Sequence, residues 1–186
     1  IATAAGDLTI KLWDSQSGKH INTLSGHTGA IRDLLFSPDS KLLVTVACDN
    51  TIRLWKAESD TSIKIIQSQA FCPDFVRFSP NGKFISATDG TRSASLWEVT
   101  SGRKINSFMG SKKGIFHASF SPNSKLFATS GAESLVRIWN LDSSRNQQVL
   151  TGRFKAVRCF FFSPDGLSIA TSSEDDTVRV WDVNSG

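Results

Sequence analysis

The chain has 186 residues and a formal net charge of +4, and it is 39% hydrophobic and 20% charged. This length supports a packed core without disulfide staples, and the composition excludes a low-complexity chain. The small positive balance excludes a strongly basic nucleic-acid tail and slightly favours acidic partners. No apolar run is long enough to span a membrane.

Three cysteines, Cys48, Cys72 and Cys159, lie in or beside strand-like runs without CxxC spacing. Because an odd number argues against a secreted disulfide framework, we expect buried, reduced thiols. The chain opens inside a strand-like run, "IATAAGD", with no basic and apolar leader, so we expect its natural N-terminus to lie further upstream. We therefore expect an intracellular protein, cytoplasmic rather than nuclear.

In chain order, the first complete set of elements consists of short runs rich in β-branched and aromatic residues, which predict strands. Turns separate them: "FSPDS" has a proline suited to a type I turn, and "CDNT" is typical of a tight hairpin. No ten-residue stretch keeps a helical period, so no helix is predicted. The predicted strands are 30–36, 41–48, 51–55 and 62–67.

These elements repeat with a period of 42 residues. Four "FSP" turns recur at this spacing, and the columns six and ten residues before the tryptophans are mostly acidic residues and threonines. Four strands in each period predict an array of small sheets. The tryptophans that carry the period are Trp13, Trp55, Trp97, Trp139 and Trp181.

The "GH" at 26–27, the "FSPD" turn and the runs "TIKLWD", "TIRLWK", "VRIWN" and "TVRVWD" resemble the WD-repeat β-propeller family. The resemblance covers essentially the whole chain and implies an all-β fold of four-stranded antiparallel blades, usually seven to a ring. We expect a propeller segment from a larger ring, because an open propeller exposes apolar blade faces and unpaired edges. The expected parts are a partial blade 1–25, blades 26–67, 68–109 and 110–151, and a partial blade 152–186.

His27, Thr45, Asp49 and Trp55 map onto the structural tetrad that the resemblance implies. A buried indole or carboxylate needs hydrogen-bond partners, and a linked chain of them is stiff. Thr, His and Asp also occur in hydrolase triads, but we expect a structural role here. Only the second blade has the complete set in sequence, so the other blades are expected to be less stable.

Other catalytic signatures are absent from the sequence. There is no glycine-rich phosphate loop and no HExxH motif, and His20, His27 and His117 do not form a ligand cluster. We therefore expect no enzyme, no cofactor and no metal site.

The resemblance places partner contacts on the top face of the propeller, four residues before each FSP phenylalanine and just before each turn acid. Phe116 has two open interpretations: an aromatic anchor for a partner, or a residue packed under a neighbouring loop. The nearby lysines and arginines form either a basic patch or ordinary surface charge, and a patch favours an acidic or phosphorylated peptide. The predicted partner-binding residues are Arg32, Asp74, Phe116, Arg158, Glu174, Lys112 and Lys113.

The function predicted from the sequence is a non-enzymatic protein–protein interaction scaffold. One alternative is a substrate-recruiting or sensor propeller of a ubiquitin-ligase adaptor or a signalling NTPase, because residues 26–39 are loosely similar to WD-repeat SOCS-box proteins. The other is a nucleic-acid-binding propeller, although the aromatic residues of a single-strand platform are missing.

Overall fold

The structure, a computed structural model, describes residues 1–56, 59, 62–68, 72–88, 93–109, 114–143, 146–152 and 155–186. Every regular element in these ranges is a β-strand, which confirms the all-β prediction. The chain divides into two compact units. The first unit comprises residues 1–76 and 100–102, and the second comprises 77–99 and 103–186.

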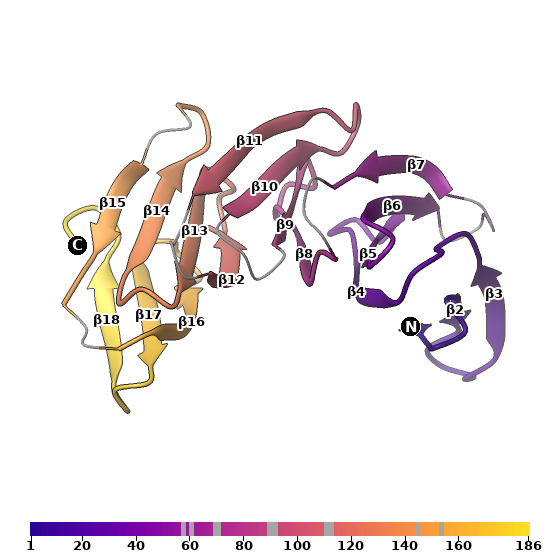
Figure 1. The fold of residues 1–186 in the computed structure, drawn as a ribbon, viewed down its shortest axis with the longest axis horizontal. Coiled ribbons are helices and arrows are strands. Elements are labelled where there is room, and N and C mark those ends of the chain that lie inside the picture. The colour runs from indigo at the N-terminus through magenta and orange to yellow at the C-terminus, as the bar shows by residue number, and fades with distance from the viewer. Residues whose placement is uncertain are drawn as a thin grey trace. The chain divides into compact units, whose positions relative to one another are not determined.

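The strands form five antiparallel sheets in which neighbours along the chain are paired (Figure 1). The first sheet contains β1 (Ala2–Ala4), β2 (Ile10–Trp13) and β3 (His20–Leu24), and the second contains β4 (Ile31–Phe36), β5 (Leu42–Ala47), β6 (Thr51–Lys56) and β7 (Ser62–Gln67). The third contains β8 (Phe75–Phe78), β9 (Phe84–Thr88), β10 (Ser93–Glu98) and β11 (Lys104–Met109). The fourth contains β12 (Ile115–Phe120), β13 (Leu126–Gly131), β14 (Val136–Asn140) and β15 (Asn146–Leu150), and the fifth contains β16 (Val157–Phe162), β17 (Ser168–Ser173) and β18 (Val178–Asp182).

The burial of each strand follows its place in the sheet. β5 and β13 are second strands, and nearly all of their residues are buried, which explains their almost continuous small and apolar sequences. β7 is an outer strand and alternates between exposed and partly or fully buried residues up to Ile66. The predicted strands 30–36, 41–48, 51–55 and 62–67 thus correspond to β4–β7.

The repeated FSP turn is held by its serine. The Ser37 hydroxyl donates to Asp39 at 2.6 Å and accepts the amide of Leu42 at 2.9 Å. One hydroxyl therefore closes the turn at both ends, as in other serine-based turns. The same pair of bonds recurs at Ser79, Ser121 and Ser163.

Each unit has its own apolar core between sheets. In the first unit, Trp55 and Leu43 of the second sheet pack with residues of the first sheet. The second unit has one cluster that includes Phe108 and Phe127 and another that includes Ile138 and Phe160. Trp55 therefore belongs to one of these clusters, and the partly buried Trp139 and Trp181 pack against the other two.

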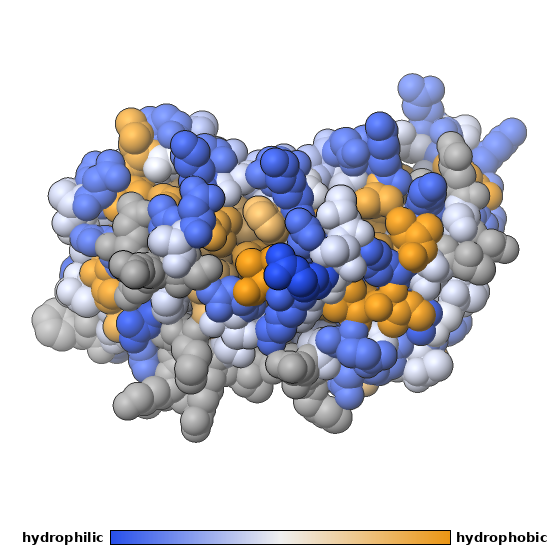
Figure 2. Space-filling model, turned by 90° about the horizontal axis from the view of Figure 1, so that it is seen from above, coloured by the Kyte–Doolittle hydropathy of each residue, from blue (hydrophilic) through white to orange (hydrophobic). Residues whose placement is uncertain are grey.

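One face of the fifth sheet differs from its counterparts. Val178 and Val180 are 73% and 71% exposed, whereas Val136 and Ile138, at the same positions of the fourth sheet, are 1% and 0% exposed. Figure 2 shows that apolar side chains also reach the surface elsewhere, in groups among polar ones. The fifth sheet therefore presents an apolar surface that the equivalent residues of the fourth sheet bury.

Candidate functional site

The four tetrad residues of the second sheet form one chain of hydrogen bonds. The Trp55 indole donates to the Thr45 hydroxyl at 2.9 Å, and this hydroxyl lies 2.7 Å from Nε2 of His27. On the other side of the ring, Nδ1 of His27 lies 2.8 Å from Oδ2 of Asp49. The chain crosses the sheet from the third strand to the turn between β5 and β6.

The protonation of this chain follows from its chemistry. Burial lowers the pKa of His27, although Asp49 acts in the opposite direction, so the ring is neutral at pH 7. A carboxylate only accepts, so Nδ1 carries the proton and the Thr45 hydroxyl donates to Nε2. Burial alone would raise the pKa of Asp49, but hydrogen bonds from Thr51, the Thr28 amide and His27 lower it to about 2.

The hydroxyl, imidazole and carboxylate are linked in the order of a hydrolase triad, but no substrate reaches them. The side chain of His27 is 0% exposed, and Thr45 is also 0% exposed. The Thr45 oxygen is in addition occupied by the indole of Trp55. A nucleophile needs room for the reacting carbon beside it, so this geometry supports a structural chain rather than a catalytic one.

In three other sheets, the described residues also include the bond between tryptophan and threonine. It measures 2.8 Å between Trp13 and Thr3, 2.9 Å between Trp181 and Thr171, and 3.4 Å between Trp139 and Thr129. Alanine occupies this position in the third sheet, at residue 87, and offers no hydroxyl. The positions that correspond to His27 in the later sheets, 69, 111 and 153, lie outside the described residues.

Three of the predicted contact positions share a backbone irregularity. The pairing of β4 with β5 shifts register between Ile31 and Asp33, so Arg32 is the extra residue of a β-bulge. Equivalent shifts leave Phe116 and Arg158 as extra residues in β12 and β16. A bulged residue has no partner in the neighbouring strand, and its side chain leaves the normal alternation of the sheet.

The bulges lie beside the turn between the second and third strands. The amide of Cys48 donates to the carbonyl of Ala30 at 2.8 Å, and Glu174 makes the same bond to Ala156 at 3.0 Å. We call these adjoining segments the rim of each unit. The rim contains Arg32, Cys48, Cys72 and Asp74 in the first unit, and Phe116, Ala132, Arg158 and Glu174 in the second.

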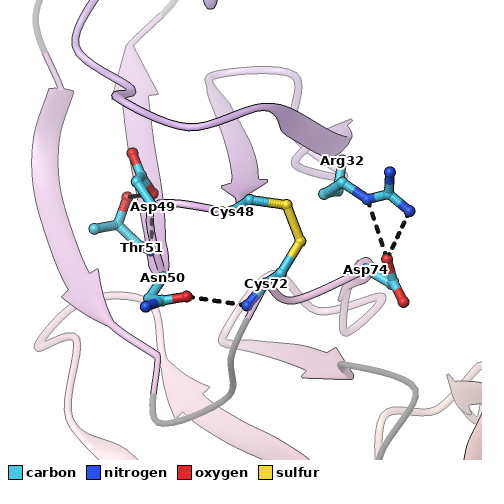
Figure 3. Close-up of a disulfide and its surroundings, with 7 residues drawn as sticks. All are labelled: Arg32, Cys48, Asp49, Asn50, Thr51, Cys72 and Asp74. Atoms are coloured by element: carbon cyan, nitrogen blue, oxygen red, sulfur yellow. Dashed lines mark hydrogen bonds and ion pairs between the residues drawn. A yellow bond between two sulfur atoms is a disulfide. The ribbon is translucent and has the colours of Figure 1, made fainter.

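In the first unit, the two predicted contact residues neutralise each other. Nε and Nη2 of Arg32 donate to Oδ1 of Asp74 at 3.1 and 2.9 Å (Figure 3). The Arg32 side chain is still half exposed, which leaves it accessible to another carboxylate. Both residues lie at predicted contact positions, and their ion pair balances one charge with the other.

The same rim contains a disulfide between Cys48 and Cys72 (Figure 3). The expectation of reduced thiols is therefore wrong for these two cysteines, while Cys159 is free and partly buried. The two residues are 24 positions apart and approach because the segment before β8 lies against the turn between β5 and β6. Cysteine spacing contains no information about this approach.

In the second unit, three predicted residues contact one another. The Arg158 guanidinium lies 5.5 Å from the centre of the Phe116 ring and forms an ion pair with Glu174. The Phe116 ring is half-buried, whereas the Arg158 side chain is 64% exposed. The ring lies against the Arg158 guanidinium, and its role as an aromatic anchor for a partner stays a prediction. Lys112 and Lys113 lie outside the described residues, so the proposed basic patch remains a prediction.

One column of inner-strand residues was not predicted to link repeats. Asp33 and His117 each directly follow a bulge residue. Asp33 accepts a hydrogen bond from the amide of Val76 at 3.0 Å, and His117 accepts one from the amide of Phe160 at 3.4 Å. Burial lowers the pKa of His117 to about 4, and the positive charge of Arg77 adds to this shift. Each of the two accepts a hydrogen bond from the residue 43 positions later in the sequence. This shared spacing is the signal from which the contacts between repeats could have been predicted.

Among the described residues, no three His, Cys, Asp or Glu side chains gather as metal ligands, and no helix is long and apolar enough to cross a membrane.

Comparison with known proteins gives matches to WD-repeat sequences. A 46-residue segment, 25% of the chain, is 48% identical to the nuclear distribution protein PAC1 of Mycosarcoma maydis, 52% identical to nuclear distribution protein nudF 2 of Talaromyces marneffei, and 54% identical to nuclear distribution protein nudF of Aspergillus niger. The chain covers only 10% of the length of each of these relatives.

The profile of the "WD domain, G-beta repeat" family matches residues 18–56, 102–140 and 144–182, which together make up more than half of the chain. Proteins with these repeats generally act as scaffolds for protein–protein interaction and are generally not enzymes. The sheets, the tryptophan column and the FSP turns all agree with this match, and the chain belongs to the WD40 repeat family.

Proposed function

We propose that this chain is a non-enzymatic interaction module whose rims bind acidic or phosphorylated peptides of partner proteins. The observation that carries the proposal is the group of Phe116, Arg158 and Glu174. It combines an accessible aromatic surface with a guanidinium held above it, the kind of pair that recurs at interaction hot spots.

The chemistry of the group favours an anionic ligand. The guanidinium forms planar pairs of hydrogen bonds with carboxylate or phosphate, and Glu174 already occupies part of this capacity. A ligand anion therefore binds by competing with Glu174. Two phosphate charges compete better than one carboxylate, so we expect phosphorylated peptides to bind more tightly than glutamate-containing ones.

The charge of the described rims supports peptide over nucleic acid. Arg32 pairs with Asp74 and Arg158 with Glu174, so in these pairs the positive charges are matched by carboxylates, whereas nucleic acid is bound by an excess of positive charge. A module that recruits substrates for a larger enzyme would use the same peptide contacts. We also propose an intracellular, cytoplasmic location for the chain. The names of the relatives add no finer assignment, because the match covers a tenth of each relative.

We also propose that the sheets are blades of a larger ring. The support is the pair Val178 and Val180, which are exposed while equivalent residues in the fourth sheet are buried. A further repeat packed on the fifth sheet would cover them. Hydrogen exchange on a longer chain tests this: protection of β18 must rise if a neighbouring blade is present.

Binding to immobilised peptides tests the proposed function. The full chain is measured against phosphoserine-containing, glutamate-containing and neutral peptides of one length, at two salt concentrations. The double variant Phe116→Ala, Arg158→Glu must lose binding. Lys125→Glu is the matched control, since Lys125 is exposed at the opposite end of β12 from Phe116. Equal binding of all three peptides, or equal loss in the control, would refute the proposal.

A further inference from the structure

The disulfide in the rim of the first unit joins two repeats. Cys48 directly follows β5, and Cys72 lies three residues before β8, the first strand of the next sheet. In Figure 3 the bond runs between the β5–β6 turn and the segment that leads to Asp74. Both cysteines are partly exposed residues.

Each end of the bond is attached to a functional element. Cys48 precedes Asp49, the carboxylate of the tetrad. The Cys72 amide donates to Oδ1 of Asn50 at 3.0 Å, and Asp74, two residues later, pairs with Arg32. The Cys72 backbone has a φ of 52°, a left-handed conformation that non-glycine residues rarely adopt. The bond therefore ties the segment that leads to Asp74 to the turn that contains Asp49.

The partners of Arg32 determine whether this rim can bind an anion. Only Pro73 separates Asp74 from the covalently anchored Cys72, so the Asp74 carboxylate stays at a high effective concentration near the guanidinium. A peptide carboxylate has to displace it. Without the disulfide, the segment before β8 gains conformational freedom, and the internal carboxylate competes less well.

We propose that the Cys48–Cys72 pair is a redox switch that controls the binding of acidic peptides at Arg32. This inference rests on the proposed function. The switch opens by thiol–disulfide exchange with a dithiol: the Sγ–Sγ bond breaks, the two cysteines take up two electrons and two protons as thiols, and the dithiol becomes a disulfide. In the proposed intracellular setting, a disulfide is more often redox-sensing than permanent.

The first measurement counts thiols in the full chain. Alkylation followed by mass spectrometry is expected to find one reactive cysteine, Cys159, before treatment with dithiothreitol and three after it. Three reactive thiols in protein purified without reductant and exposed to oxidised glutathione would overturn the proposal, because the pair would then not form.

The second measurement is the affinity for a fluorescent peptide of consecutive glutamates. Reduction is expected to tighten binding about two- to fivefold, the range that an exposed ion pair such as Arg32–Asp74 supports. Cys48→Ser with Cys72→Ser must bind like the reduced protein in either buffer, and Cys159→Ser, which keeps the disulfide, must respond like the wild type. Arg32→Gln must abolish the difference between the two states.

The two measurements together distinguish failure of the redox switch from failure of the proposed function on which it rests. If the peptide binds equally in both states while the thiol count changes from one to three, the switch is refuted and the interaction module stands. If no acidic or phosphorylated peptide binds in either state, the proposed function itself fails.

Discussion

Replacing Thr45 by valine tests whether the hydrogen-bond chain of the second sheet stabilises the fold. Valine fills almost the same space but has no hydroxyl. The substitution leaves two buried groups without partners, the indole N–H of Trp55 and Nε2 of His27. Because each unsatisfied buried group costs about 1–3 kcal/mol, we expect Thr45→Val to destabilise its unit by about 2–5 kcal/mol.

The same substitution in other sheets supplies matched controls. Thr171 accepts the indole N–H of Trp181 at 2.9 Å and donates to the carbonyl of Arg179 at 3.4 Å, so Thr171→Val is expected to cost about 1–2 kcal/mol. Thr129 accepts the indole N–H of Trp139 at 3.4 Å, so Thr129→Val should cost less than about 1 kcal/mol. Trp139 and Trp181 are both only partly buried, which keeps the cost low in the two controls. The expected loss of stability therefore decreases in the order Thr45→Val, Thr171→Val, Thr129→Val.

The assay is native-state hydrogen exchange, because it reports the opening free energy of each sheet separately. Protection of β5 and β6 is compared between wild type and Thr45→Val, and of β13–β14 and β17–β18 between wild type and the two controls. A Thr45→Val cost no greater than that of Thr129→Val would refute the reasoning, because the chain of bonds would then add nothing beyond one weak contact.

Three further predictions concern acid stability and the turns. The folded pKa of Asp49, about 2, lies below its ordinary value of 3.8. The ionised carboxylate therefore stabilises the fold by at most about 2 kcal/mol, an effect that is complete above about pH 4 and lost as the pH falls towards 2. In urea unfolding, the free energy of unfolding should depend less on pH in Asp49→Asn than in the wild type. His117 has a folded pKa of about 4 against 6.5 ordinarily, so the unfolded chain binds its proton first and the stability of the second unit falls as the pH drops from about 6.5 to 4; His117→Gln should remove this slope in the same measurement. Ser121→Ala removes a hydroxyl that bonds Asn123 at 2.8 Å and the Leu126 amide at 2.9 Å, and should lower the free energy of unfolding by about 1–3 kcal/mol, whereas Ser143→Ala, in an exposed turn, should lower it by less.

Much of the fold could be predicted because its determinants are local. The Ser37 turn is built from residues within five positions, and the strand patterns need only the alternation of a few side chains. A period of 42 residues then repeats one local solution several times. The number of strands in each repeat and the burial of the tryptophans follow from that period together with ordinary strand chemistry.

The rim could be predicted only in part, because its properties depend on contacts between repeats. Arg32 and Asp74 occupy the same column, as do Phe116 and Arg158, and within each of these two pairs the residues of consecutive repeats are in contact. Considered one repeat at a time, each is a separate contact residue. Together they neutralise or cover each other, which changes the expected charge of the surface.

The disulfide could not be predicted because its two cysteines belong to different columns. Cys48 lies in the column of Glu174, and Cys72 lies in that of Ala30 and Ala156. Within a single sheet these columns are joined by a backbone hydrogen bond, as between Glu174 and Ala156. Cys48 makes that bond to Ala30 and in addition reaches Cys72 of the next repeat.

The sheets share some positions, which stabilise each repeat, and differ at another position, which lies on the rim. The tryptophan and the turn serine have the same structural role in several repeats, because they form hydrogen bonds with equivalent partners in each. The bulge position has the same backbone environment in three described sheets but presents arginine, phenylalanine and arginine. A repeated scaffold can therefore change a bulge residue without altering its core, and under the proposed function this is the position where repeats would differ in binding.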